Sequence, residues 1–260
     1  MTLRPARPLL AACALPLVLA ACGGSTGDAA PSGDGAPERT VTVFAAASLT
    51  DAFADVAAAF EDEHPGVTVE LSFAGSSALR EQVLDGAPAD VVATADEAVM
   101  ADLVDEGAVG EPVAFATNRL QLAVPAGNPA GVGGLDDLGR GDLVIGLCAA
   151  GVPCGDLARR VLDGAGVEPA PDTEEPNVRA LLAKVEAGEL DAGLVYATDV
   201  RAAGDAVEAV DVPVGEEGTT RYPIAAVADA PHPRAADAFV AFVTTPAARD
   251  VLADHGFGPP

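Results

Sequence analysis

The chain has 260 residues, and its 40 Asp and Glu against 14 Lys and Arg give it a net charge of −26. This length is enough for one large or two modest domains with a hydrophobic core. The sequence has no basic stripe that could neutralise phosphates, so a nucleic-acid partner is disfavoured. Beyond the N-terminal leader, no segment is long and apolar enough to span a bilayer.

Residues 1–21 have the pattern of a secretory signal: two arginines precede an apolar run over 8–20 that is too short for a permanent span. The run ends in "LAAC", which resembles the bacterial lipobox and implies lipidation of Cys22; an ordinary cleaved signal is the alternative. Residues 22–38 are rich in Gly, Ala, Ser and Pro, as in a flexible tether. We therefore expect an extracytoplasmic protein that is anchored to the cell membrane as a lipoprotein.

From residue 39 onward, strand-like and helix-like segments alternate. Short apolar runs predict strands at 41–46, 67–73, 89–95, 120–124, 143–147, 193–196 and 224–228. Helical spacing of apolar residues predicts helices at 50–63, 77–86, 97–106, 155–164 and 178–188, and a last pair within 234–254 that is broken at Pro246. This alternation predicts an α/β fold with largely parallel sheets.

Two segments have the features of crossings between lobes. Over 115–129 an apolar strand runs into Pro, Gly and Asn turns, and 212–227 has a similar character. If both are crossovers, residues 39–118 together with 219–260 form lobe 1, and 119–218 form lobe 2. Two α/β lobes joined by two strands suit a clamp that closes on a ligand.

Five strand-to-helix junctions combine small residues with hydrogen-bond donors. They contain Ser48, Ser76, Pro153-Cys154-Gly155, Pro176-Asn177-Val178 and Tyr196. Helix N-termini expose N–H groups and a partial positive charge, so they can bind an anion without Lys or Arg. In open α/β sheets, ligands gather at the C-terminal ends of strands, where all five junctions lie.

Each junction also has a purely structural interpretation. Ser48, Ser76 and Asn177 are residue types that commonly cap helices, and the two prolines are common at helix starts. Tyr196 could be a core aromatic residue with a satisfied hydroxyl. The anion-site hypothesis therefore depends on all five junctions lying together.

Two cysteines remain once Cys13 leaves with the signal and Cys22 takes the lipid. Cys148 and Cys154 stand in "CAAGVPC", and in an oxidising compartment they most simply form a disulfide. A zinc site is the alternative, but two thiolates with no nearby His lack the remaining ligands.

Longer motifs carry a family resemblance. "VTVFAAASLTDAF", "SFAGSSALREQV" with "GAPADVVATAD", "VPCGDLA", "NVRALLAKVEAGELDAGLVYATD" and "HGFG" resemble the molybdate-binding proteins of bacterial ABC importers, in the same order over nearly all of 40–258. The resemblance implies the two-lobed periplasmic-binding-protein fold (type II), in which each lobe is a mainly parallel sheet flanked by helices. It implies a monomeric protein, not an enzyme and without a cofactor, that binds molybdate or tungstate and delivers it to a membrane permease.

The resemblance also implies the ligand contacts. Lobe 1 would contribute the Ser48 and Ser76 hydroxyls, and lobe 2 the backbone N–H groups of Cys154 and Val178 and the hydroxyl of Tyr196. The family often has alanine at the position of Cys154, but a main-chain donor is indifferent to its side chain. The predicted bridge to Cys148 would stiffen this anion-binding loop.

The acidic composition bears on selectivity. Loss of the leader's two arginines takes the net charge from −26 to −28, so long-range attraction cannot bring in a dianion, and binding must come from short-range donors in a dry cleft. A lining of neutral donors leaves the proton of hydrogen phosphate or arsenate unpaired, at a cost of about 1–3 kcal/mol. Sulfate is fully ionised, and we expect it to be refused by cavity size.

Other functions remain as alternatives. A hydrolase would need His64, His232 or His255 beside the serines, yet none follows a predicted strand end with them and no G-x-S-x-G motif exists. A binding protein for tungstate, sulfate or another small anion is the stronger alternative. An amino-acid binder would use an arginine for the carboxylate, and the sequence offers Arg80, Arg119 and Arg221. A structural surface lipoprotein would bind no oxyanion.

Overall fold

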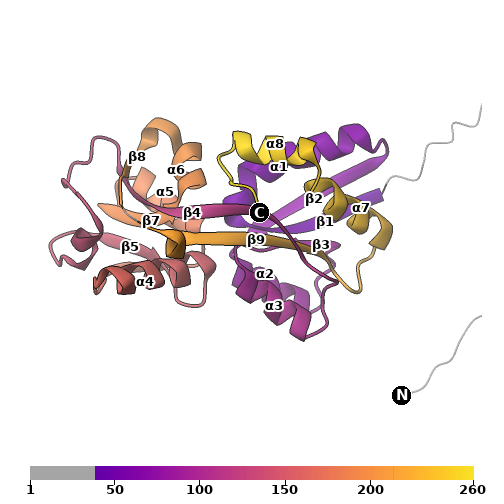
Figure 1. Ribbon diagram of the computed structural model, residues 1–260, viewed down its shortest axis with the longest axis horizontal. Helices are drawn as coiled ribbons and strands as arrows, with labels where there is room; N and C mark the ends of the chain where they lie inside the picture. Colours follow the sequence, from indigo (N-terminus) through magenta and orange to yellow (C-terminus); the bar gives the residue numbers. More distant parts are fainter. Residues whose placement is uncertain (1–38, 213) are drawn as a thin grey trace, which may run out of the picture. The chain divides into compact units, whose positions relative to one another are not determined.

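The computed structural model describes residues 39–212 and 214–260 (Figure 1). The predicted signal peptide, the tether and the lipidation site Cys22 lie outside these residues. Within the described ranges, no helix combines the length and the apolar character that a bilayer crossing requires.

Strands and helices alternate through the described part of the chain. The strands are β1 (Arg39–Ala46), β2 (Val67–Ala74), β3 (Val91–Ala93), β4 (Val113–Pro125), β5 (Ile145–Cys148), β6 (Thr173–Glu175), β7 (Ala192–Tyr196), β8 (Val207–Val210) and β9 (Thr219–Ala226). The helices are α1 (Thr50–Glu63), α2 (Ser76–Leu84), α3 (Glu97–Asp105), α4 (Pro153–Ala165), α5 (Val178–Glu186), α6 (Ala197–Ala203), α7 (Pro233–Val243) and α8 (Pro246–Asp254). A short 3₁₀ turn, η1 (Ala47–Leu49), precedes α1.

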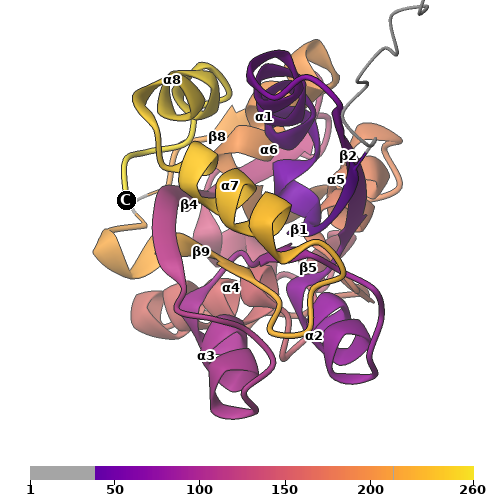
Figure 2. The same ribbon diagram turned by 90° about the vertical axis from the view of Figure 1, so that its right-hand side faces the viewer.

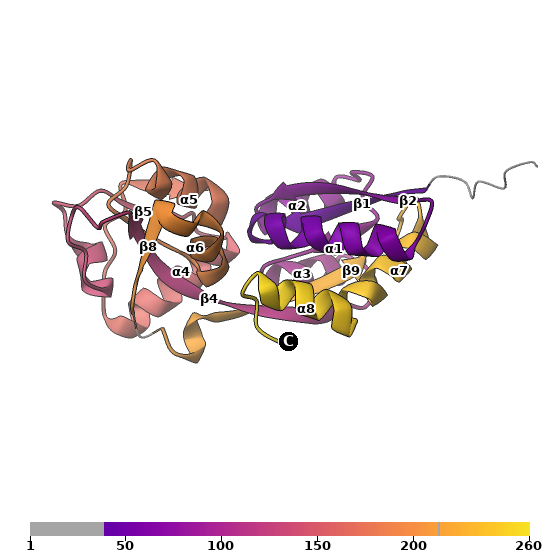
Figure 3. The same ribbon diagram turned by 90° about the horizontal axis from the view of Figure 1, so that it is seen from above.

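The strands form two groups that share one long strand. In the first group β1 pairs in parallel with β2 and β3, and β3 pairs antiparallel with β9. In the second group β5 pairs in parallel with β6 and β7. Strand β4 pairs along its first half with β9 and along its second half with β7 and β8, so it passes through both groups (Figure 3). The predicted α/β fold is confirmed, with antiparallel pairing where β4 and β9 join it.

Several elements differ from the sequence prediction. Strand β4 begins at Val113, earlier than the predicted 120, because Thr117, Asn118 and Arg119 interrupt the apolar run although they pair with β9. The short strands β6 and β8 and the helix α6 were not predicted. Each of them has three to seven residues, too few to establish a hydrophobic period.

The hydrophobic core follows the same division. The buried residues of one cluster all lie between Leu120 and Val214. In the first group, alternate residues of β1 face opposite sides: Val43 packs with α1 and α7, whereas Phe44 packs with α2 and α3. Figure 2 shows these two helical layers on opposite sides of the sheet. The exact lobe boundaries, 118/119 and 218/219, stay a prediction.

A disulfide joins the end of β5 to the start of α4. Cys148 and Cys154 are six positions apart and both are buried. The next residue, Gly155, lies so close to the loop that a Cβ atom there would be 2.0 Å from the Ala149 carbonyl oxygen. No group of three potential metal ligands occurs among the described residues. The loop is therefore held by a covalent bond and by a helix start that packs directly on it.

We predict that replacing both cysteines by alanine lowers the free energy of unfolding by about 2–3 kcal/mol, because opening this short loop returns entropy to the unfolded chain. Urea denaturation of the oxidised protein measures the loss. Reduction of the unaltered protein should reproduce it, and reductant should leave the double variant unchanged. An unchanged urea midpoint in the variant would contradict the prediction.

Candidate functional site

One cavity brings together the strand-to-helix junctions. Its wall consists of Ala46, Ala47, Ser48, Gly75, Ser76, Ala95, Val152, Pro153, Cys154, Asn177, Val178 and Tyr196. All five predicted contact residues are therefore on this wall, and no described residue lining it is charged. The enclosed space amounts to about 10 Å³, far below the range of about 300–1,000 Å³ typical of pockets for organic ligands. The wall residues therefore lie close together around a very small space.

Three helices begin at this cavity, and their first N–H groups have no intrahelical carbonyl to bind. In α4 the first amide bonded to a carbonyl of its own segment is that of Asp156, whose nitrogen lies 2.9 Å from the Val152 oxygen. In α5 the Asn177 side chain accepts a hydrogen bond from the Ala180 N–H at 2.9 Å. The amides of Cys154 and Val178 thus remain available for a ligand. Together the helix starts supply partial positive charge without a cation.

Neither serine on the wall is a helix cap. Helix α1 begins at Thr50 with Leu49 in the capping position, and Ser76 is the first residue of α2, not its cap. The oxygen of Ser48 lies 2.9 Å from the Tyr222 hydroxyl, and the oxygen of Ser76 accepts a hydrogen bond from the Ala95 N–H at 3.0 Å. The capping interpretation was wrong for both serines, while Asn177 does cap α5.

Tyr196 carries an unused hydroxyl. Its side chain is 1% exposed, and its hydroxyl has no hydrogen-bond partner among the described residues. Burial raises its pKa well above the ordinary value, so the group keeps its proton. A buried donor without an acceptor costs about 1–3 kcal/mol. The Tyr196 hydroxyl lies near that of Tyr222 but makes no hydrogen bond of good geometry among the described residues, so it suits a ligand that accepts hydrogen bonds.

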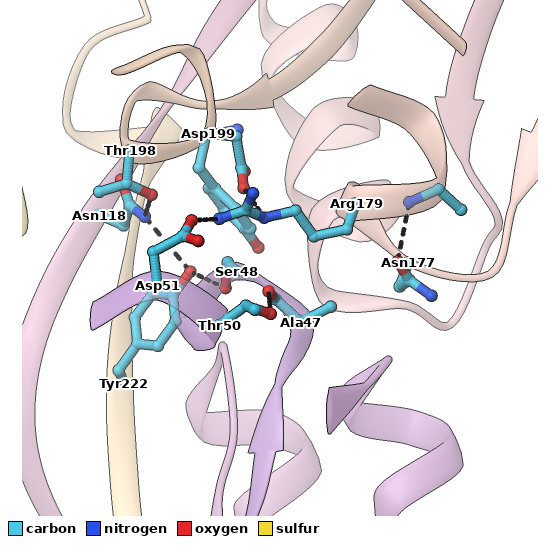
Figure 4. Close-up of polar contacts among 12 residues, drawn as sticks. Ala47, Ser48, Thr50, Asp51, Asn118, Asn177, Arg179, Thr198, Asp199 and Tyr222 are labelled. Atoms are coloured by element: carbon cyan, nitrogen blue, oxygen red, sulfur yellow. Dashed lines mark hydrogen bonds and ion pairs between the residues drawn. The ribbon is translucent and has the colours of Figure 1, made fainter. Parts of the chain in front are cut away.

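A buried chain of polar groups stands behind Ser48 (Figure 4). The Asn118 amide nitrogen donates to the Thr198 hydroxyl at 2.8 Å and to the Tyr222 hydroxyl at 3.4 Å. Tyr222 in turn contacts Ser48. The sequence reasoning missed Asn118, Thr198 and Tyr222. For Asn118 and Tyr222 the only signal was their place as polar residues inside the two crossing segments, and Thr198 lies outside both segments.

An ion pair crosses between the two groups of strands. Arg179 of α5 binds Asp51 of α1, and its Nε lies 3.0 Å from an oxygen of Asp199 (Figure 4). Asp199 is fully buried, and its other oxygen accepts a hydrogen bond from the Tyr196 N–H at 3.1 Å. Burial raises the pKa of Asp199 to about 7, although Arg179 acts in the opposite direction. The charge of Arg179 is thus already directed to two carboxylates.

Two further contacts close the cavity wall. The Ser77 hydroxyl donates to the Gly151 carbonyl. Gly75 packs so tightly on α5 that a Cβ atom there would lie 2.4 Å from the Pro176 carbonyl oxygen. Residues near 75 and residues near 176 come from opposite groups of strands, so the cavity is closed by direct contact between them.

The residues considered for other functions lie elsewhere. None of the three histidines lines the cavity: His64 stacks on Phe60, and the other two contact aspartates. The side chain of Arg80 binds Asp102, and neither Arg119 nor Arg221 is on the cavity wall. The wall as described thus has no histidine for acid–base chemistry and no arginine for a carboxylate.

Comparisons with known proteins agree with this architecture. A family model described as "Bacterial extracellular solute-binding protein" matches residues 41–258. The "Molybdate-binding protein ModA" of Mycobacterium tuberculosis (strain ATCC 25618 / H37Rv) is 40% identical over 243 residues, which cover 93% of each chain. The protein of the same name from Escherichia coli (strain K12) is 33% identical, over 85% of this chain and 90% of its own.

Solved structures share the fold. The sulfate-binding protein SubI of Mycobacterium tuberculosis H37Rv superposes with a TM-score of 0.72 at 25% identity, over 85% of this chain and 87% of its own. The periplasmic molybdate-binding protein of Azotobacter vinelandii gives a TM-score of 0.69 at 20% identity, over 85% of this chain and 99% of its own. The predicted two-lobed periplasmic-binding-protein fold is confirmed. Proteins of this class bind solutes outside the cytoplasm and are not enzymes. Because the family model spans nearly all of the described residues, this chain belongs to the bacterial extracellular solute-binding protein family.

Proposed function

We propose that this protein binds molybdate in the cavity between its lobes through neutral hydrogen-bond donors, and delivers it to the membrane permease of an ABC importer. The observation that carries the proposal is the gathering of Ser48, Ser76, Cys154, Val178 and Tyr196 on one small, uncharged wall. The names of the relatives at 40% and 33% identity support molybdate as the ligand. Tungstate, sulfate or another small anion is the second candidate, which the likeness to a sulfate-binding protein favours.

The donors replace the water that the ion loses. A dianion that enters a closed cavity gives up its hydration, at a large cost unless hydrogen bonds compensate. The hydroxyl of Tyr196, which lacks an acceptor among the described residues, gains one when the ion arrives. The amides of Cys154 and Val178 point from helix starts, whose dipoles favour negative charge. In a low-dielectric site each of these bonds is stronger than in water.

Closure of the lobes completes the shell around the ion. The contacts of Gly75 with Pro176, of Ser77 with Gly151 and of Arg179 with Asp51 support a closed state. The two strands that join the lobes, β4 and β9, are the natural hinge. Lipidation at Cys22 would hold the monomeric protein close to the permease.

Loss of one serine hydroxyl should weaken binding. We predict that Ser48→Ala and Ser76→Ala each lower molybdate affinity by about 1–3 kcal/mol, because each removes one donor to the ion. Isothermal titration calorimetry measures the change. Ser72→Ala on β2 is the control, since Ser72 is not on the cavity wall. Wild-type affinity in both cavity variants would refute the site assignment.

Closure can be tested separately from the donors. Gly75→Ala would place a Cβ atom 2.4 Å from the Pro176 oxygen, a clash that the proposed opening of the lobes would relieve, and the backbone of Gly75 suits any residue. We predict at least tenfold weaker molybdate binding with little change in the urea midpoint of the ligand-free protein. Gly110→Ala, where the nearest atom would be 3.8 Å away, is the control. Equal affinity in Gly75→Ala and the wild type would mean that this contact does not form in the complex.

Selectivity follows from the neutral lining. In competition calorimetry we expect molybdate and tungstate to bind tightly, sulfate less tightly and hydrogen phosphate least, because its proton finds no acceptor. Affinity should depend weakly on ionic strength, since no cationic side chain contacts the ion. Tight phosphate binding, or a steep loss of affinity with salt, would contradict this mode of binding.

A further inference from the structure

The hydrogen-bond chain behind Ser48 has a direction. We propose that Asn118 and Tyr222 are positioning residues that hold the Ser48 hydroxyl as a proton donor toward the cavity, and that they thereby set the preference of the site for oxyanions without a proton. This inference rests on the proposed function, because it requires an oxyanion in the cavity.

The direction begins at the Asn118 amide. The backbone N–H of Arg119 donates to the Asn118 side-chain oxygen at 2.9 Å. A backbone N–H can only donate, so this contact fixes which end of the amide is oxygen. The nitrogen end then faces Thr198 and Tyr222, and both hydroxyl oxygens must accept. Asn118 is 5% exposed, so the buried network determines its orientation.

Tyr222 passes this direction on. Its oxygen accepts from Asn118, so its own proton must point elsewhere. The Ser48 hydroxyl lies 2.9 Å away, whereas the neighbouring Tyr196 hydroxyl makes no hydrogen bond of good geometry with it. Tyr222 is fully buried, and burial raises its pKa above the ordinary value, so the hydroxyl remains protonated. Tyr222 therefore donates to Ser48.

Ser48 then has its proton available for the cavity. It accepts from Tyr222 and does not need to donate to it. The proton of Ser76 is also available to the cavity, because the Ala95 N–H donates directly to the Ser76 oxygen. Both serines thus offer protons to the ligand, one oriented by a backbone amide and the other by two side chains.

The orienting groups come from the strands that join the lobes. Asn118 lies on β4 and Tyr222 on β9, which pair with each other, whereas Thr198 belongs to α6 beyond the crossing. The ring of Tyr222 is held by edge contacts with Phe115, Tyr196 and Phe257. The orientation of the Ser48 proton is therefore set by side chains of the joining strands β4 and β9 and by their packing, not by the residues of the cavity wall alone.

Asn118→Asp reverses this chain with little change in shape. A carboxylate only accepts, so the Tyr222 proton turns toward residue 118 and the Ser48 proton turns toward Tyr222. A lone pair of Ser48 then faces the ion. Molybdate should bind at least tenfold more weakly, and hydrogen phosphate, whose proton now finds an acceptor, should lose less or gain.

The measurement is the ratio of the hydrogen phosphate Kd to the molybdate Kd, taken by competition calorimetry at a pH above the second pKa of phosphate. Both ligands are then dianions, so the added negative charge weakens both alike and cancels in the ratio. We expect the ratio to fall by about tenfold in Asn118→Asp. In Asn118→Asp with Tyr222→Phe, it should equal that of Tyr222→Phe alone.

The proposal would be overturned if the Kd ratio of Asn118→Asp stayed within twofold of the wild type. It would also be overturned if Asn118→Asp changed the ratio equally with Tyr222 present and with Tyr222→Phe. If Asn118→Asp does not fold, as judged by thermal denaturation, Tyr222→Phe provides the test. Ser48 can then turn freely, and the ratio should fall by about threefold; an unchanged ratio refutes the proposal. A wild-type protein that binds sulfate in place of molybdate refutes the proposed function. The ratio of the hydrogen phosphate Kd to the sulfate Kd then tests the hydrogen-bond chain behind Ser48. A wild-type protein that binds no oxyanion refutes both.

Discussion

The site depends on how closely helix N-termini from two separate cores approach one small cavity. Backbone amides are short-range donors, so they can serve an ion only if nothing bulky stands before them. Gly75 and Gly155 meet this need, because a Cβ atom at either position would collide with a backbone carbonyl. Ala46, Ala47 and Ala95 keep the rest of the wall shallow. Small residues at these positions therefore set how closely the helix starts approach the cavity.

The distribution of charge follows from the same constraint. A protein with a net charge of −26 has its arginines engaged with carboxylates at several places, as Arg140 is with Asp137 and Asp142. Arg179, which follows the donor amide of Val178, is directed to Asp51 and Asp199. Its charge is thus engaged by two carboxylates, and Arg179 is not on the cavity wall. Selection among anions can then rest on proton content and size, which neutral groups distinguish better than a cation does.

The sequence predicted most of the regular structure, and its five predicted contact residues all lie on the cavity wall, because strands, helix starts and small-residue junctions are local signals. It identified the junctions but not the role of the serines, since a capping serine and a ligand-facing serine have the same local pattern. The crossing segments drew attention to the region of Asn118 and Tyr222, but the partners of these residues could not be predicted, because their contacts join positions 80 to 174 residues apart. Strand β4 was predicted too short for the same reason: Thr117, Asn118 and Arg119 belong to the strand only through their pairing with the distant β9.

The division of the core has a kinetic consequence. Cys154, Val178 and Tyr196 belong to one hydrophobic cluster, while the residues around Ser48 and the helix that carries Ser76 pack in two other clusters. Neither half of the wall can therefore loosen without disturbing a packed interior. In the proposed complex the ion would leave when the halves part, and the lifetime of the complex would reflect the frequency of that rigid movement more than the strength of any single bond. The joining strands would then set the rate of release, and a downstream receptor could increase that rate by separating the two halves.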